Sequence, residues 1–219
     1  MKQYFIYNKE NHPCLTLFFA GWGMDEHPFI DYRPIGSDLL VCYDYRSLDF
    51  DFSLLEGYRE IRVVAWSMGV WAASCLLQGK GDLPVSDRIA VNGTLTPVDD
   101  EKGIPSLIFK GTLDGLNERS LQKFYRRMCG SGEATKHFLE RAPQRNIEDL
   151  REELRLIGER AVASPLPSFT WKRAVVGTED LIFSAANQRR AWTQTGVMQD
   201  ERQAPHYDEA LLREWIERK

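Results

Sequence analysis

Residues 61–71 read IRVVAWSMGVW, and they join two kinds of local structure. The first part is an apolar run with β-branched residues, which is typical of a buried strand. From Met68 onward the chain continues with good helix formers. Ser67 stands between the two, on a turn that must be tight. The expected fold and chemistry are built outward from that turn.

A serine on a sharp strand-to-helix turn resembles the nucleophile elbow of the α/β-hydrolases, usually written G-x-S-x-G. The turn lifts the hydroxyl clear of the sheet and places the next backbone N–H and the helix N-terminus beside it, where they stabilise charge formed during acyl transfer. Here Ala65 replaces the first glycine, a modest intrusion of one methyl, and Gly69 is retained. A serine in an ordinary strand–helix connection is the alternative.

The composition excludes several classes of protein. The 219 residues are 43% hydrophobic and 27% charged, with a formal net charge of -4, so we expect one domain with a sizeable core and no nucleic-acid partner. No apolar run approaches the length that spans a membrane. The first residues lack the features of a signal peptide, and the four cysteines form no C-x-x-C pair. We therefore expect a cytoplasmic protein, favoured as a monomer, with reduced cysteines.

Apolar runs alternate with connecting segments along the chain. This alternation predicts an α/β fold with a mostly parallel, doubly wound sheet, whose ligands bind at the carboxyl ends of the strands. Connections such as residues 44–58 carry little helical signal, so we expect long loops and reduced flanking helices. Helices are expected at residues 68–78, 188–192 and 210–217. The expected strands are residues 3–7, 14–20, 38–43, 60–66, 88–92 and 171–176, with a short one at 193–198.

The segment 97–167 differs in character from the rest. It contains two amphipathic helical patterns, at residues 118–128 and 146–163, and prolines punctuate its end. It also carries a local excess of positive charge, because residues 119–160 hold 10 Lys/Arg against 7 Asp/Glu. We expect residues 1–96 and 168–219 to form the α/β core and residues 97–167 to form a helical insertion.

A serine nucleophile needs a base, normally a histidine oriented by a carboxylate. In α/β-hydrolases the chain order is serine, acid, histidine. Of the four histidines, His12 and His27 precede Ser67, and His137 lies in the helical insertion. His206 lies between the last expected strand and the final helix, so it is the expected base.

Two aspartates compete for the orienting role. Asp180 follows the strand expected at residues 171–176 and precedes His206 by 26 positions. Asp114 lies in a similar Gly-Thr-x-Asp turn, but the whole helical insertion would then separate acid from base. Asp180 is favoured, Asp114 stays open, and Glu179 is a weaker neighbour.

An oxyanion hole needs two backbone donors. One is the N–H of the residue after the nucleophile, here Met68, and the other comes from a loop near the N-terminal strands. The stretch Gly21-Trp22-Gly23 follows a buried strand, so the Trp22 N–H is the expected second donor, although two glycines can also make a simple turn. Neither G-x-G-x-x-G, a P-loop nor H-E-x-x-H occurs in the chain, so no cofactor and no metal are expected.

Several motifs together resemble the BioG-type pimeloyl-[acyl-carrier protein] methyl ester esterases. They lie at residues 20–24 (AGWGM), 43–46 (YDYR), 65–71 (AWSMGVW), 91–94 (VNGT) and 205–207 (PHY). The resemblance implies an α/β-hydrolase with a helical lid that hydrolyses the methyl ester of pimeloyl-ACP in biotin precursor synthesis. It also implies Ser67 as nucleophile, His206 as base and Asp180 as orienting acid.

The resemblance gives the basic insertion a partner, because acyl-carrier proteins are acidic. The carrier would dock on positive helix residues, and the alternative is an ordinary solvated helix face. Two other functions stay open: a serine hydrolase acting on another ester or thioester, and a non-catalytic α/β protein that binds an acyl partner. The candidate docking residues are Lys123, Arg126, Arg127, Arg151 and Arg155.

Overall fold

A seven-stranded sheet in the order β1-β3-β2-β4-β5-β6-β7 organises the computed structural model, which describes residues 1–9 and 12–218. The β1–β3 pair is antiparallel and the other neighbours are parallel. The mostly parallel α/β sheet expected from the sequence is confirmed. The strands are β1 (Lys2–Tyr7), β2 (Cys14–Phe19), β3 (Asp38–Tyr43), β4 (Glu60–Trp66), β5 (Val85–Val91), β6 (Arg173–Gly177) and β7 (Met198–Arg202).

Hydrophobic clusters cover both faces of the sheet. Successive residues of β4 point to opposite faces, so that Val63 belongs to one cluster and Val64 to the other. Helices α1 (Met68–Leu77) and α6 (Ala185–Thr195) contribute to the first cluster, and α7 (Glu209–Ile216) contributes to the second. Burial on both faces explains why the central strands read as continuous apolar runs.

Two connections have no more than a single turn of 3-10 helix. These are η1 (His27–Phe29), between β2 and β3, and η2 (Phe52–Leu55), between β3 and β4. The expected long loops are therefore present. No helix within the described residues is both apolar enough and long enough to cross a bilayer.

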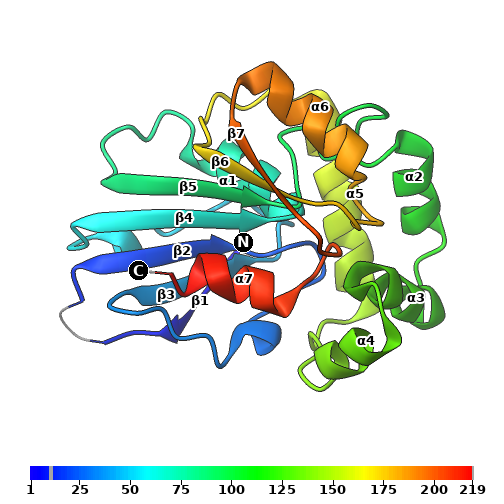
Figure 1. Ribbon diagram of the computed structural model, residues 1–219, viewed down its shortest axis with the longest axis horizontal. Coiled ribbons are helices and arrows are strands. Elements are labelled where there is room, and N and C mark those ends of the chain that lie inside the picture. The colour runs from blue at the N-terminus through cyan, green and yellow to red at the C-terminus, as the bar shows by residue number, and fades with distance from the viewer. Residues whose placement is uncertain (10–11, 219) are drawn as a thin grey trace.

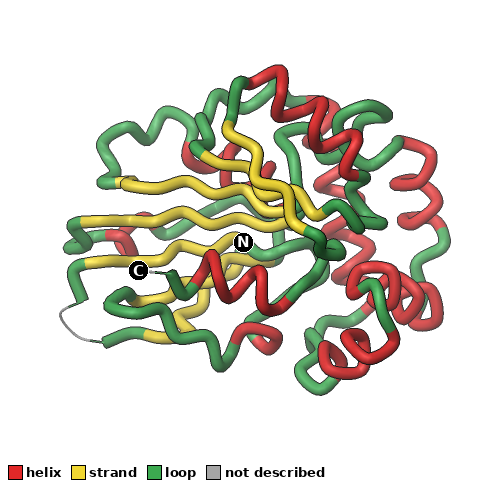
Figure 2. Tube along the Cα trace, viewed as in Figure 1, coloured by secondary structure: helices red, strands yellow, loops and turns green. Residues whose placement is uncertain are grey.

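Four helices lie between β5 and β6 in the chain and gather beyond one end of the sheet (Figures 1 and 2). Of these, α3 and α5 match the expected amphipathic patterns. The other two helices were not predicted from the sequence. Gly111 interrupts the pattern of one, and a Gly-Ser-Gly stretch lies at the start of the other. The helices are α2 (Ser106–Asp114), α3 (Glu118–Cys129), α4 (Gly132–Leu139) and α5 (Ile147–Ala163).

The last strand lies later than expected. Residues 193–195 complete α6 instead, and Gly196 ends that helix in the left-handed conformation with φ 70°. The strand β7 begins only at Met198. Helices commonly end with a glycine in the left-handed conformation. The short apolar pattern at residues 193–198 hid this helix end.

Candidate active site

Ser67 occupies the turn between β4 and α1 in a strained backbone conformation. Its φ is 59° and its ψ is -128°, outside the helical and strand regions. The chain around it is tightly packed: a Cβ atom on Gly69 would lie 2.3 Å from the Phe19 carbonyl oxygen, and one on Gly93 would lie 2.3 Å from the Ser67 carbonyl oxygen. Strain of this kind persists only where the surroundings impose it, and it occurs often at active sites.

Three buried side chains form a continuous chain of hydrogen bonds at the carboxyl ends of the strands. His206 Nε2 lies 2.9 Å from Ser67 Oγ, and His206 Nδ1 lies 2.8 Å from Asp180 Oδ2. Asp180 follows β6 and His206 follows β7. The structure thus brings together the three residues that chain order singled out, in the arrangement that activates a serine hydroxyl.

The Asp180 carboxylate is itself held by three donors. Its Oδ1 accepts hydrogen bonds from the backbone N–H groups of Ile182 (2.7 Å) and Phe183 (2.9 Å), and its Oδ2 accepts one from Gln188 Nε2 (3.0 Å). Sequence reasoning missed Gln188, a fully buried residue of α6. In the sequence, Gln188 stands out only as a polar residue within a weak helical pattern.

The His206 ring is fixed by aromatic neighbours and by its own backbone. Phe183 stacks on it with an interplanar angle of 9°. The His206 carbonyl accepts hydrogen bonds from Trp66 Nε1 (2.8 Å) and Asn92 Nδ2 (3.0 Å). Asn92 also accepts the Gly177 N–H through Oδ1 (2.7 Å), so one side chain joins β5, β6 and the histidine.

The rival acids lie elsewhere. Asp114 is exposed at the end of α2, where it pairs with Lys110. Glu179 is exposed and accepts a hydrogen bond from Gln203 Nε2 (3.0 Å). Neither makes a hydrogen bond to His206 within the described part of the chain, whereas Asp180 does.

Ser67 and His206 open into a narrow pocket with a cavity volume of about 40 Å³. The two expected oxyanion donors line it as well, and across residues 1–9 and 12–218 neither the Trp22 nor the Met68 amide donates a hydrogen bond to the protein. The helices α2, α3 and α5 supply 7 of its 15 lining residues. Apart from Ser67, His206, Thr112 and Arg127, the lining side chains are apolar. Its apolar residues include Ile104, Phe109, Phe124, Leu154, Leu181 and Ile182.

Residues 1–216 match the family described as "Pimeloyl-ACP methyl esterase BioG". The chain belongs to the BioG family. A crystal structure of BioG from Haemophilus influenzae is similar to it, with a TM-score of 0.88, 38% sequence identity and 96% of both chains covered. A hydrolase from Pseudomonas aeruginosa shares the fold alone, at 10% identity and a TM-score of 0.67. The α/β-hydrolase fold expected from the sequence is confirmed.

Two curated relatives extend the comparison. An uncharacterized protein of Haemophilus influenzae is 39% identical over 206 residues, which cover 92% of each chain. A malonyl-[acyl-carrier protein] O-methyltransferase of Bacteroides fragilis is 54% identical over 198 residues, which cover 90% of this chain. The chain spans only 40% of the length of that methyltransferase. Family membership and fold together support an enzyme that acts on esters.

The five basic residues singled out in this BioG-family sequence fall into two groups. Lys123, Arg126 and Arg127 are exposed on α3 and line a groove that adjoins the pocket, and Arg127 lines both. Arg151 instead donates a hydrogen bond to the Leu116 carbonyl (2.6 Å). Arg155 pairs with two glutamates of its own helix, at 2.7 and 2.6 Å.

One group of potential metal ligands occurs among the described residues. The ligand atoms of Asp25, Glu26 and His27 lie within 4.8 Å of one another. Both Asp25 oxygens already accept backbone N–H groups, from His27 (3.0 Å) and Gln144 (2.6 Å), and Glu26 accepts the Tyr43 hydroxyl (2.5 Å). These hydrogen bonds account for the cluster without an ion.

Proposed function

We propose that this protein is a serine carboxylesterase that hydrolyses the methyl ester of pimeloyl-[acyl-carrier protein], an intermediate of biotin precursor synthesis. The observation that carries the proposal is the hydrogen-bonded chain Ser67–His206–Asp180, which opens into an apolar pocket in a member of the BioG family. An apolar pocket suits the methylene chain of a pimeloyl group, because burial of each CH₂ contributes about 0.8 kcal/mol.

In the first half of the reaction, His206 Nε2 takes the proton of Ser67 as the hydroxyl oxygen attacks the ester carbonyl. The amides of Trp22 and Met68 stabilise the oxyanion of the tetrahedral intermediate. Asp180 keeps His206 in the tautomer that presents Nε2 to the serine and stabilises the imidazolium that forms. The intermediate collapses as His206 protonates the departing methoxide, and methanol leaves.

In the second half, water attacks the pimeloyl-serine ester, with His206 again acting as base. Protonation of Ser67 then releases the free carboxylate, still attached to the carrier through its other end. The charged carboxylate is disfavoured in an apolar pocket, which promotes product release.

We assign the segment 97–167 as a lid on the α/β core formed by residues 1–96 and 168–219. Three of its helices, α2, α3 and α5, supply walls of the pocket, so access to Ser67 depends on them.

We place the carrier on the groove beside the lid. Its three basic residues Lys123, Arg126 and Arg127 complement an acidic carrier. Exposed apolar residues of the same groove, Leu107 (81% exposed) and Leu181 (64% exposed), would be covered on docking. Arg151 and Arg155 contribute less, since intramolecular acceptors already engage them.

The methyltransferase name of the Bacteroides fragilis relative does not oppose an esterase. This chain covers 40% of that protein, and the match takes in 90% of this chain. We infer that methyl transfer belongs to the part of that relative which this chain does not cover.

The test uses methyl pimeloyl-carrier protein as substrate. We expect methanol release together with a carrier whose mass falls by one methylene, and neither product with Ser67→Ala. Release of free carrier would instead identify a thioesterase. A wild-type protein that releases neither product would overturn the proposal, and complementation of an esterase-deficient biotin auxotroph by wild type but not by Ser67→Ala tests it in cells.

A further inference from the structure

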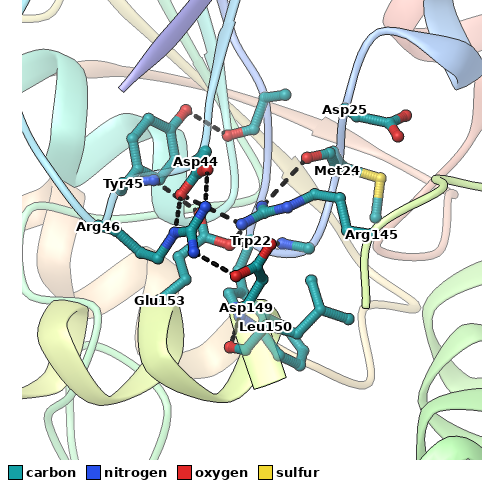
Figure 3. A network of polar contacts seen from close by, with 12 residues as sticks. Trp22, Met24, Asp25, Asp44, Tyr45, Arg46, Arg145, Asp149, Leu150 and Glu153 are labelled. Atoms are coloured by element: carbon teal, nitrogen blue, oxygen red, sulfur yellow. Dashed lines mark hydrogen bonds and ion pairs between the residues drawn. The ribbon is translucent and has the colours of Figure 1, made fainter. Parts of the chain in front are cut away.

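A buried polar network joins α5 to the loops that follow β2 and β3 (Figure 3). At its centre is Glu153, which is 0% exposed. One carboxylate oxygen accepts the Tyr45 N–H (2.8 Å), and the other accepts the Gly23 N–H at the longer distance of 3.4 Å. A single side chain of α5 therefore holds two strand-end loops.

Arg145 balances the charge of this carboxylate. Its Nη1 lies 2.6 Å from Glu153 Oε2 and donates to the Met24 carbonyl at 3.3 Å. Its Nη2 lies 3.2 Å from Asp44 Oδ1, a charge contact whose angle does not make a hydrogen bond. Burial raises the pKa of Glu153, and the charge of Arg145 and the Tyr45 N–H oppose that rise.

Further contacts fasten the loop at residues 21–25 to α5 and to the segment before it. The indole Nε1 of Trp22 donates to the Leu150 carbonyl (2.9 Å), and Asp25 accepts the Gln144 N–H (2.6 Å). The Trp22 ring also packs edge-on against Phe124 of α3, with centroids 5.2 Å apart. Residues 22 to 25 are thus each held from the helical segment.

A buried charge cluster of this kind is not required for stability, since well-packed apolar residues of similar volume are often as stabilising. Its contacts converge on the loop whose residue Trp22 lines the pocket of Ser67. An oxyanion donor must lie within about 0.5 Å of its productive position to be effective.

We propose that Glu153, paired with Arg145, is a positioning residue for the oxyanion-binding loop. Through the Gly23 N–H and the Tyr45 N–H it fixes the loop at residues 21–25 against α5, and so places the Trp22 amide. This inference rests on the proposed function and adds a residue that touches neither substrate nor triad.

The main test compares Glu153→Gln with Glu152→Gln, a matched change at the neighbouring residue of α5, whose side chain is 46% exposed and pairs with Arg155. The probe is p-nitrophenyl butyrate, and kcat is normalised to the fraction of Ser67 labelled by a fluorophosphonate. For Glu153→Gln we expect kcat to fall about 10-fold to 100-fold, less than the loss of a whole oxyanion donor, with KM changed less than about threefold. Glu152→Gln should leave both constants unchanged.

A second readout follows the loop itself. Amide hydrogen exchange across residues 21–25 should become faster in Glu153→Gln and stay at the wild-type rate in Glu152→Gln, because only the first change weakens the acceptor of the Gly23 N–H. Unchanged exchange together with unchanged kcat would overturn the inference.

The double variant Glu153→Gln with Arg145→Met separates positioning from stability. It removes the buried guanidinium that has lost its Glu153 partner and keeps the Asp44 contact, so we expect the melting temperature to recover while kcat stays low. Recovery of kcat along with the melting temperature would show a purely structural role and would overturn the inference.

The wild-type reactions separate this inference from the proposed function. If wild type hydrolyses the probe through Ser67 but Glu153→Gln does so equally well, the positioning role fails and the esterase stands. If wild type neither hydrolyses any ester nor labels at Ser67, the esterase fails, and the positioning role fails with it.

Discussion

The two halves of the site are built in different ways. The three proposed catalytic side chains, Ser67, Asp180 and His206, follow the ends of β4, β6 and β7, where strand pairing and short turns place them. About half of the residues that line the pocket come from α2, α3 and α5, and long-range contacts such as those of Glu153 fasten α5 to the strand-end loops. The proposed chemistry therefore lies at the end of the sheet, and the proposed control of access and carrier binding lies on the helices.

The effect of a substitution on activity should depend on which of these two parts of the site it alters. A substitution at the sheet end should reduce turnover of every ester, whether small or attached to a carrier. A substitution on the outer helices should matter only for the carrier-bound substrate. Activity and stability measurements on variants of each part can test this contrast.

The largest effect is expected from Ser67→Ala. Loss of the nucleophile should lower kcat by about 10⁴–10⁶ on both p-nitrophenyl butyrate and methyl pimeloyl-carrier protein. Steady-state assays with both substrates measure it, and circular dichroism checks that the fold is retained. Substantial turnover of either substrate would mean that another group does the chemistry.

The next effect concerns the orienting acid. Asp180→Asn should lower kcat by about 10⁴, because the amide no longer holds the productive tautomer of His206. Asp114→Asn is the matched control and should be neutral, since that side chain is exposed beside Lys110. A loss of activity in the Asp114 variant alone would reverse the assignment.

We expect the packing around the turn at Ser67 to be too tight for an added methyl group. Gly69→Ala would place a methyl group 2.3 Å from the Phe19 carbonyl oxygen, and we expect it to lower the free energy of unfolding by about 2–4 kcal/mol. Gly132→Ala in α4 is the control, because its Cβ would meet no atom within 4 Å. Urea denaturation measures both, and equal stabilities would contradict the contrast between a rigid sheet end and a tolerant helical segment.

A smaller effect is expected from reversing charge in the groove. Lys123→Glu with Arg126→Glu, two residues that line the groove but not the pocket of Ser67, should lower kcat/KM for the carrier-bound ester by about tenfold at low salt, mainly through slower association. The effect should shrink as ionic strength rises, and p-nitrophenyl butyrate should be turned over normally. Arg119→Glu with Lys136→Glu changes the same amount of charge on exposed residues outside the groove and serves as control. Equal losses in both double variants would exclude a specific docking surface.

The smallest effect is in the pH dependence of stability. Burial acts to raise the pKa of Asp44, but hydrogen bonds from Arg46 and the charge of Arg145 outweigh it, and the net pKa is lowered. A carboxyl with a lowered native pKa stabilises the fold above its unfolded pKa of about 3.9, and this stabilisation is lost as the pH falls below that value. The difference in melting temperature between wild type and Asp44→Asn should therefore narrow from pH 7 to pH 3. A difference that widens on acidification would contradict the shift.

The same contrast between the strand ends and the helices holds for what could be predicted from the sequence. The strands around Ser67 follow from local patterns, as does the placing of His206 and Asp180 in chain order, and the structure brings these three side chains together. Their catalytic roles stay predictions. The helices α2 and α4 were missed because glycines obscure their patterns. Glu153 was missed because its partners Gly23 and Tyr45 lie more than 100 positions away. Gln188 lies only 8 positions from Asp180, and it was missed because a helical pattern does not reveal which polar side chain is buried. Of the five basic residues, two proved to be engaged within the protein, which only packing reveals.

The hydrogen bond between Trp66 and the His206 carbonyl limits how far Ser67 and His206 can move apart. Trp66, the residue before the nucleophile, donates its indole N–H to the His206 carbonyl, and Asn92 reinforces this bond while it also joins β5 to β6. Serine and histidine are thereby anchored to the same central strands, which are the last part of such a fold to open. A rearrangement of the helices α2 to α5 would therefore leave the hydrogen-bonded chain of Ser67, His206 and Asp180 assembled.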